Sequence, residues 1–349
     1  MSDVIGFLLA FGITAAVIPV LARAAGGWGL LAQPGPRMSH EVPVPAIGGL
    51  AMGGAFLAVY AINGALTGLG THFSTPLAAA VAVTLVGGVL DDRHQMHSLP
   101  KFGFQIAAAA LLVTGGSALL THLGQLMSSN PFTLGRWAVP LTIFALVGVM
   151  NAMNMADGLD GLAGALTLAA CVNFGAAASL AGHSAEFAVI CITMGAALAF
   201  LYFNARSPWR RHAAVFMGDT GSLLLGLLLG WLAVRLAMAE RPALAPITAV
   251  WIIALPIADT VTLLVRRALR GRNPFRADRK HLHHVLLALG LSPGQAVGAI
   301  LVLSFALGAA ALAAEMLKVP EYAMFYAYMI CLAAHGVAAE IACRRLRLS

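Results

Sequence analysis

Charged residues are scarce in this chain. Asp, Glu, Lys and Arg make up 10% of its 349 residues, whereas hydrophobic residues make up 60%. Soluble domains usually carry about 25% charged residues, so this composition excludes an ordinary soluble protein. The Ala, Leu, Gly and Val runs also lack the period-2 alternation of a membrane barrel. The predicted fold class is therefore an all-α integral membrane protein.

Cysteine pairs and an N-terminal basic region are also lacking. The four cysteines form no Cys-x-x-Cys pair and lie in or at the end of apolar runs. We expect them to pack as small apolar side chains rather than to carry thiol or disulfide chemistry. No Lys or Arg precedes Arg23, whereas a secretory signal begins with a positive region. The first apolar run is therefore expected to be a true membrane span.

Apolar runs of roughly 20 residues are long enough to cross a membrane as helices. About eleven such runs occur, without a composition shift that would divide the chain, so residues 1–349 are predicted to form one polytopic domain. The predicted spans are 3–22, 47–66, 76–90, 103–122, 137–153, 160–181, 186–203, 220–238, 246–265, 294–315 and 321–342.

The basic residues predict the orientation of these spans. Seventeen of the 21 Lys and Arg residues fall in alternate loops or in the C-terminal tail. Because basic loops stay in the cytoplasm, the N-terminus is predicted outside and the C-terminus inside. The net charge of +7 then reflects membrane topology rather than nucleic-acid binding. The loops expected to form a cytoplasmic active site are about 23–46, 91–102, 154–160, 204–219 and 266–293.

The few acidic residues are gathered at the ends of apolar runs. Seven of the 14 stand there: Asp91, Asp92, Asp157, Asp160, Asp219, Asp259 and Asp278. Ionised carboxylates beside hydrocarbon are costly, so we expect these to bind something cationic, most simply a metal ion that holds a phosphate.

Asp91 and Asp92 end one apolar run and are followed by Lys101. Adjacent carboxylates repel each other unless a cation lies near, and either Mg²⁺ or a lysine would serve. Lys101 could anchor a phosphate. The plainer alternatives are a solvated helix end for the pair and an interfacial lysine that reaches toward water.

Residues 151–164, NAMNMADGLDGLAG, contain the most specific pattern. Asn151 and Asn154 lie one helical turn apart, and Asp157 and Asp160 repeat that spacing. Amides can bind phosphate or sugar hydroxyls, and carboxylates can bind Mg²⁺. Two amides and two carboxylates between apolar spans are poor packing residues, so a binding role is predicted.

Asp219 begins an apolar run within FMGDTGSLLLG, residues 216–226. It could be an ordinary helix N-cap, or a metal ligand beside backbone amides that favour anions. Asn204 and Phe216 precede it and could hold a base or ribose, although either could equally be a packing residue.

Residues 266–290 contain seven basic residues, Arg266 and Arg267 among them. The segment also holds three histidines: His281, His283 and His284. Because Cys is absent nearby and dense arginine opposes a metal, diphosphate binding is favoured over zinc. A positive loop that binds anionic lipid is the alternative. Asp259, seven residues before Arg266, is either a functional carboxylate or a partner for an arginine.

Together with PRMSHEVPVPAIGG (36–49) and LDDRHQMHSLPKFGFQ (90–105), these blocks resemble the polyprenyl-phosphate N-acetylhexosamine-1-phosphate transferases. The segment RNPFRADRKHLHH (272–284) is similar to the WecA-type branch, which transfers GlcNAc-1-phosphate to undecaprenyl phosphate. Two positions depart from the family pattern: Gln33 precedes Pro34, and DDRHQ lacks a third Asp.

The resemblance implies a UDP-N-acetylhexosamine donor, undecaprenyl phosphate as acceptor, Mg²⁺ or Mn²⁺ as cofactor, and a location in the bacterial inner membrane among its lipids. It also implies a homodimer, by analogy with the translocase relatives. Asp219, helped by Asp92 or Asp91, would hold the metal, while Asp157 and Asp160 would position the nucleotide or metal.

The resemblance assigns the remaining positions to the substrate. His281, His283, His284 and Arg267 would bind the diphosphate, and Asn204 and Phe216 would face the uridine. Two alternatives stay open: a phospho-MurNAc-pentapeptide transferase of peptidoglycan synthesis and, in a different class, a membrane transporter.

Overall fold

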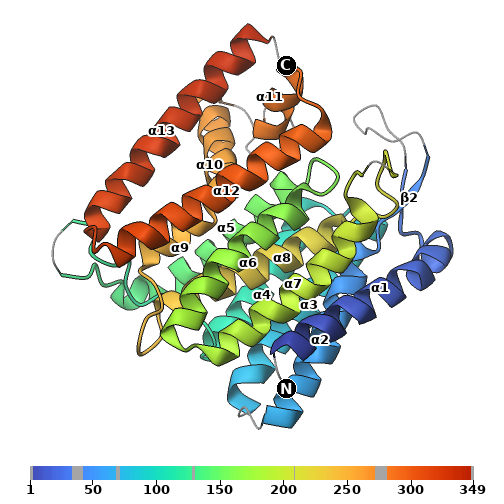
Figure 1. The fold of residues 1–349 in the computed structure, drawn as a ribbon, viewed down its shortest axis with the longest axis horizontal. Helices are drawn as coiled ribbons and strands as arrows, with labels where there is room; N and C mark the ends of the chain where they lie inside the picture. Colours follow the sequence, from blue (N-terminus) through green and yellow to red (C-terminus); the bar gives the residue numbers. More distant parts are fainter. Residues whose placement is uncertain are drawn as a thin grey trace.

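The computed structural model describes residues 3–33, 42–67, 71–127, 130–207, 209–271 and 281–346. Asp278 and residues 36–41 of the first motif lie outside these ranges. The described chain is almost entirely helical (Figure 1).

The helices, in chain order, are α1 (Asp3–Trp28), α2 (Gly48–Thr67), α3 (Thr71–His94), α4 (Ser98–Thr114), α5 (Ala138–Ala156), α6 (Leu162–Ala181), α7 (Ser184–Asn204), α8 (Gly218–Ala237), α9 (Pro246–Ile252), α10 (Ala254–Leu269), α11 (Leu282–Ala288), α12 (Pro293–Met316) and α13 (Glu321–Arg345), with a short 3-10 helix at Gly135–Trp137.

Within the described residues, nine helices are long and apolar enough to cross a membrane, or ten if α9 and α10 count as one broken span. The shorter apolar helix α4 occupies the fourth predicted span. The prediction of an all-α polytopic membrane protein is therefore confirmed.

Two predicted spans differ from the structure. The predicted span 246–265 is not one straight helix, because α9 and α10 meet at an angle of 84°. Pro256 explains the break: it lacks the N–H that would bond to Ile252, and its ring clashes with that carbonyl. The predicted span 103–122 instead begins at Ser98 and ends at Thr114, so that Lys101 belongs to the first turn of α4 rather than to a loop.

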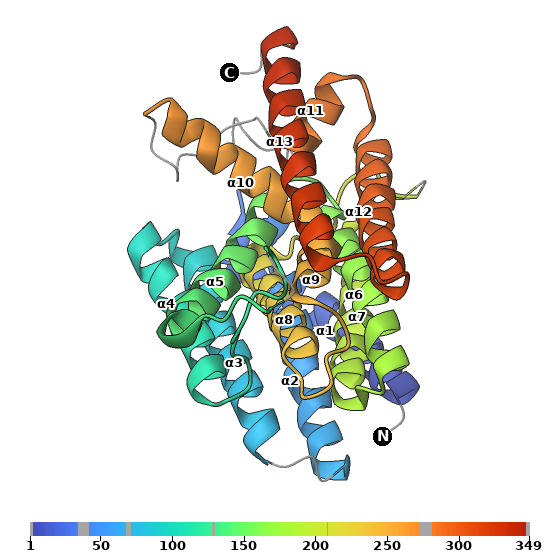
Figure 2. The same cartoon turned by 90° about the vertical axis from the view of Figure 1, so that its left-hand side faces the viewer.

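Helix α8 is the centre of the bundle and is surrounded by α2, α3, α5 and α6 (Figures 1 and 2). Glycines allow its neighbours to approach closely. A Cβ on Gly226 would lie 2.5 Å from Cα of Met150 in α5, and one on Gly49 in α2 would lie 2.1 Å from the backbone nitrogen of Gly221. Small residues are a usual means of close helix packing in membranes. They bring the start of α8 beside the end of α5.

A small sheet ties the first connection to the start of α8. Strands β1 (Leu31–Ala32) and β2 (Val44–Pro45) pair antiparallel. The N–H of Phe216 donates to the carbonyl of Pro45 (2.8 Å), and the carbonyl of Phe216 accepts from Gly48 N–H (2.9 Å). The end of the first motif is thereby joined to the FMGD motif.

Helices α10 to α13 lie together at the side of the bundle, with α13 at its outer edge (Figures 1 and 2). The α13 span is mostly exposed in the isolated chain, as expected of a helix that faces lipid.

Candidate active site

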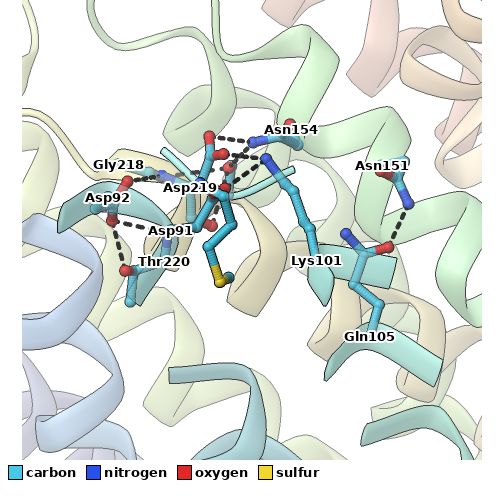
Figure 3. Close-up of polar contacts among 11 residues, drawn as sticks. Asp91, Asp92, Lys101, Gln105, Asn151, Asn154, Gly218, Asp219 and Thr220 are labelled. Carbon is cyan, nitrogen blue, oxygen red and sulfur yellow. Dashed lines mark hydrogen bonds and ion pairs between the residues drawn. The ribbon is translucent and has the colours of Figure 1, made fainter. Parts of the chain in front are cut away.

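Asp92, at the end of α3, caps the beginning of α8. Its carboxylate accepts hydrogen bonds from the backbone N–H of Asp219 (2.7 Å), from the N–H of Thr220 (3.1 Å) and from the Thr220 hydroxyl (2.6 Å), as Figure 3 shows. A carboxylate is stabilised at a helix N-terminus by the free N–H groups and the helix dipole. Gly218 is required here, because its φ is +68° and a Cβ would lie 2.3 Å from an Asp92 oxygen.

Lys101 joins the carboxylates of two other helices. Its Nζ lies 2.7 Å from Oδ2 of Asp91 and donates a hydrogen bond to Oδ2 of Asp219. Asp91 is 6% exposed, and its Oδ1 accepts from the backbone N–H of Met96 (2.9 Å). The predicted phosphate anchor is therefore paired with protein carboxylates in this structure.

Asn154, near the end of α5, completes the cluster. Its Nδ2 donates to Oδ1 of Asp219 (2.7 Å) and to the hydroxyl of Ser222 (2.9 Å). Asn151 lies one turn earlier but bonds elsewhere: its Nδ2 donates to Oε1 of Gln105 in α4 (2.6 Å) and to the carbonyl of Val147 (2.8 Å). Asn151 thus links α5 to α4. Its partner Gln105 could not be identified from the sequence pattern.

Asp157 follows the end of α5 and is partly buried. Burial, followed by the negative charges of Asp219, Asp160 and Asp92, raises the pKa of Asp157 to about 7. Because the charges of Asp219 and Asp92 act on it, Asp157 lies beside the carboxylate cluster. Asp160 is turned to a different partner, since its Oδ2 accepts from Nε of Arg206 at 2.8 Å.

The histidines form a second group, which contacts the first at Gly158. His283 is 2% exposed, and a Cβ on Gly158 would lie 2.2 Å from its Nε2. The His283 ring centroid lies 4.2 Å from that of His284 and 5.4 Å from that of His281. Burial, with the neighbouring His284 and His281, lowers the pKa of His283 to about 3.

Asp259 in α10 is the partner of His281. Its Oδ2 lies 2.8 Å from Nδ1 of His281, and its Oδ1 accepts from the backbone N–H of Leu282 (2.9 Å). The carboxylate thus holds a histidine in place, which favours the interpretation of Asp259 as a functional carboxylate. Arg266 and Arg267, near the end of α10, are both buried, and Nη1 of Arg266 lies 3.5 Å from Sγ of Cys343 in α13.

Asn204, at the end of α7, is buried and braced by two hydrogen bonds. It is 4% exposed; its Oδ1 accepts from Gly161 N–H (2.7 Å) and its Nδ2 donates to the carbonyl of Val215 (2.8 Å). Both ends of the amide brace connections between helices. Its assignment to the uridine stays a prediction. Phe216 is partly buried beside the same strand connection.

The sequence model of glycosyl transferase family 4 matches residues 74–237, which run from α3 to the end of α8. The chain is also 31% identical to the undecaprenyl-phosphate alpha-N-acetylglucosaminyl 1-phosphate transferase of Escherichia coli (strain K12) over 312 residues, 88% of this chain and 83% of that protein. The chain belongs to glycosyl transferase family 4. This confirms the family resemblance noted in the sequence.

Two further relatives with the same name are similar over most of their length. The enzyme of Haemophilus influenzae is 33% identical and covers 89% of this chain and 87% of its own. The enzyme of Yersinia pestis is 30% identical, over 97% of this chain and 91% of its own length. In both, the similarity extends over far more of the chain than the glycosyl transferase family 4 match alone.

The donor set of the cluster suits a hard divalent cation. Asp91 and Asp219 share the ammonium of Lys101, and the charges of Asp92 and Asp157 act on the same cluster, so negative charge is in excess. Carboxylate and amide oxygens are the ligands that Mg²⁺ prefers. As the side chains stand in the described ranges, no three His, Cys, Asp or Glu residues converge on one point as ligands.

Proposed function

We propose that this member of glycosyl transferase family 4 transfers GlcNAc-1-phosphate from UDP-GlcNAc to undecaprenyl phosphate and releases UMP, the first step in building an envelope polysaccharide. The observation that carries the proposal is the convergence of Asp91, Asp92, Asn154 and Asp219 at the ends of α3, α5 and α8. The names of the relatives support the acceptor and the sugar.

The reaction exchanges one diphosphate bond for another. A phosphate oxygen of the lipid attacks the sugar-linked phosphorus of the nucleotide, the bond to the UMP oxygen breaks, and a polyprenyl-diphosphate sugar is formed. The barrier comes from bringing two anions together, so charge neutralisation and alignment are the main contributions required of the protein.

Each residue of the cluster has a distinct part in this proposal. Asp219 would hold Mg²⁺ with help from Asp91 or Asp92, and the ion would neutralise phosphate charge. Asn154 fixes the carboxylate of Asp219, and Asp92 fixes the backbone that carries it. A strong general base is unnecessary, because the second pKa of a phosphate monoester is about 6 and the nucleophile is already deprotonated near neutral pH.

The histidine group meets the chain at Gly158, next to Asp157, and would bind the diphosphate. His281 is oriented by Asp259, and His283 packs on Gly158 beside Asp157. This contact supports one continuous site made of both groups. The positive-inside pattern supports a site on the cytoplasmic face of the inner membrane. A homodimer stays a prediction.

Purified protein with Mg²⁺ and undecaprenyl phosphate should release UMP from UDP-GlcNAc. A panel with UDP-GalNAc and UDP-MurNAc-pentapeptide tests the sugar, and EDTA tests the metal. Release from the pentapeptide substrate alone would favour the peptidoglycan enzyme. Uptake of a UDP-sugar into liposomes without UMP release would favour a transporter.

Asp219→Asn provides the matched test of the metal role. It keeps the size of the side chain and one oxygen for Asn154, so the protein should fold. We expect at least a 100-fold loss of Mg²⁺-dependent UMP release, in the range seen when one electrostatic group of an active site is removed. Near-normal turnover with a normal thermal unfolding midpoint would remove Asp219 from this role.

A further inference from the structure

Lys101 occupies the gap between Asp91 and Asp219. Its ammonium lies 2.7 Å from Oδ2 of Asp91 and also donates to Oδ2 of Asp219 (Figure 3). The three side chains come from α4, α3 and α8, so this one ammonium joins three helices. The Lys101 side chain is 21% exposed, which leaves it a route toward solvent.

Both oxygens of Asp219 are already engaged. Oδ1 accepts from Asn154 and Oδ2 accepts from Lys101. The same ammonium lies 2.7 Å from Oδ2 of the buried Asp91. The carboxylate assigned to the metal is therefore held by a cation of the protein itself.

We propose that Lys101 is an exchangeable internal counter-ion. Its ammonium neutralises Asp91 and Asp219 until a divalent cation takes the same place, and the released ammonium then turns to the phosphates of the bound substrate. This inference rests on the proposed function, since it requires a metal at Asp219.

Electrostatics favours exchange over joint occupancy. An ammonium and a dication in one gap between two carboxylates would repel each other at short distance. The dication has the higher charge and the same preference for carboxylate oxygen. Lysine suits the role because its compact charge sits on a flexible four-carbon stem and can move without a change in the backbone.

The exchange predicts an effect on metal affinity that an ordinary metal site would not show. Lys101→Met keeps the length of the stem and removes the competing charge. We therefore expect the variant to bind Mn²⁺ at least about tenfold more tightly than the parent protein, even though it loses transfer activity. If the lysine only supported the site, the same variant would bind metal equally or more weakly.

The first experiment is a Mn²⁺ titration of detergent-purified protein at pH 8, with free Mn²⁺ measured by electron paramagnetic resonance. Lys318→Met is the matched control, because it makes the same chemical change at an exposed position after α12 and should leave the affinity unchanged. Tighter binding in Lys101→Met alone supports the exchange. Unchanged or weaker binding in that variant overturns it.

Asp219→Asn separates this inference from the proposed function. If the parent binds Mn²⁺ and Asp219→Asn weakens binding, but Lys101→Met does not tighten it, only the exchange is wrong. If Asp219→Asn binds as well as the parent, the metal role of Asp219 is wrong and the exchange falls with it. If the parent binds no Mn²⁺, both are wrong as well.

A second experiment uses the unaltered protein and does not depend on a variant that folds. The chain has three lysines, Lys101, Lys280 and Lys318. Reductive methylation followed by mass spectrometry should show that Mg²⁺ raises the modification of Lys101 several-fold relative to Lys318, because the ammonium is freed from its carboxylates. A ratio that stays constant or falls on addition of Mg²⁺ overturns the proposal.

Discussion

At the scale of the residue, His283 makes the stability of the fold depend on pH. Its pKa is lowered to about 3 in the folded protein, whereas a histidine in the unfolded chain titrates near 6.5. The unfolded state therefore binds the proton first as the pH falls, and stability is lost as the pH drops below about 6.5. Between pH 7.5 and pH 5.5, the titration of His283 should lower the free energy of unfolding by about 1.4 kcal/mol.

His283→Gln should reduce that acid sensitivity. The variant removes the titrating ring, so the drop in unfolding free energy between these two pH values should shrink by about 1.4 kcal/mol, as measured by denaturant titration in detergent. His212→Gln removes an exposed ring and should keep the full drop. An equal drop in unfolding free energy in the parent and in His283→Gln would contradict a buried, neutral His283 ring.

Asn204 gives a second prediction at this scale, because the sequence and the structure assign it different roles. Its two buried hydrogen bonds join the start of α6 to the segment before α8. Asn204→Ala leaves Gly161 N–H and the Val215 carbonyl without these partners, which should cost about 1 to 3 kcal/mol of stability. A lower thermal midpoint with an unchanged KM for the UDP-sugar is expected. A raised KM with normal stability would support the nucleotide contact predicted from the sequence.

At the scale of the element, the site depends on how closely α5 and α8 pack. A Cβ on Gly226 would meet the backbone of Met150, so Gly226→Ala should force the helices apart and move Asn154 away from Asp219. We expect a loss of UMP release of tenfold or more together with a lower thermal midpoint. Gly148→Ala in α5 is the control, since a Cβ there meets nothing within 4 Å and should stabilise the helix by up to about 1 kcal/mol. If both variants had the same UMP release and the same thermal midpoint, the close packing of α5 against α8 would not determine the activity of the site.

The elements also show what the sequence could and could not predict. The apolar runs located the helices, and the acidic motifs at their ends predicted a shared site that includes Asp91, Asp92 and Asp219. Helix α8 is buried on nearly every side, so its pattern does not reveal which neighbour each face meets. For the same reason, the sequence could not predict that Asn151 bonds to Gln105 or that Asn204 is buried. The break before α10 could have been predicted, because Pro256 stands inside the apolar run.

At the scale of the whole molecule, the two halves of the site must lie on one side of the membrane. The contact of His283 with Gly158 and the bonds among Asp92, Asp219 and Asn154 place the histidine and carboxylate groups at one end of the bundle. The basic loops predict that this end is cytoplasmic.

Single cysteines in a cysteine-free background provide the test of this orientation. Trp209, which is 92% exposed between α7 and α8, should be cytoplasmic, and Thr133, before α5, should face the other side. In whole cells a membrane-impermeant maleimide should label Thr133→Cys and leave Trp209→Cys unlabelled until the cells are opened. The reverse pattern would place the carboxylates away from cytoplasmic nucleotide sugars, and a reaction with a UDP-sugar would then be excluded however well the residues are arranged.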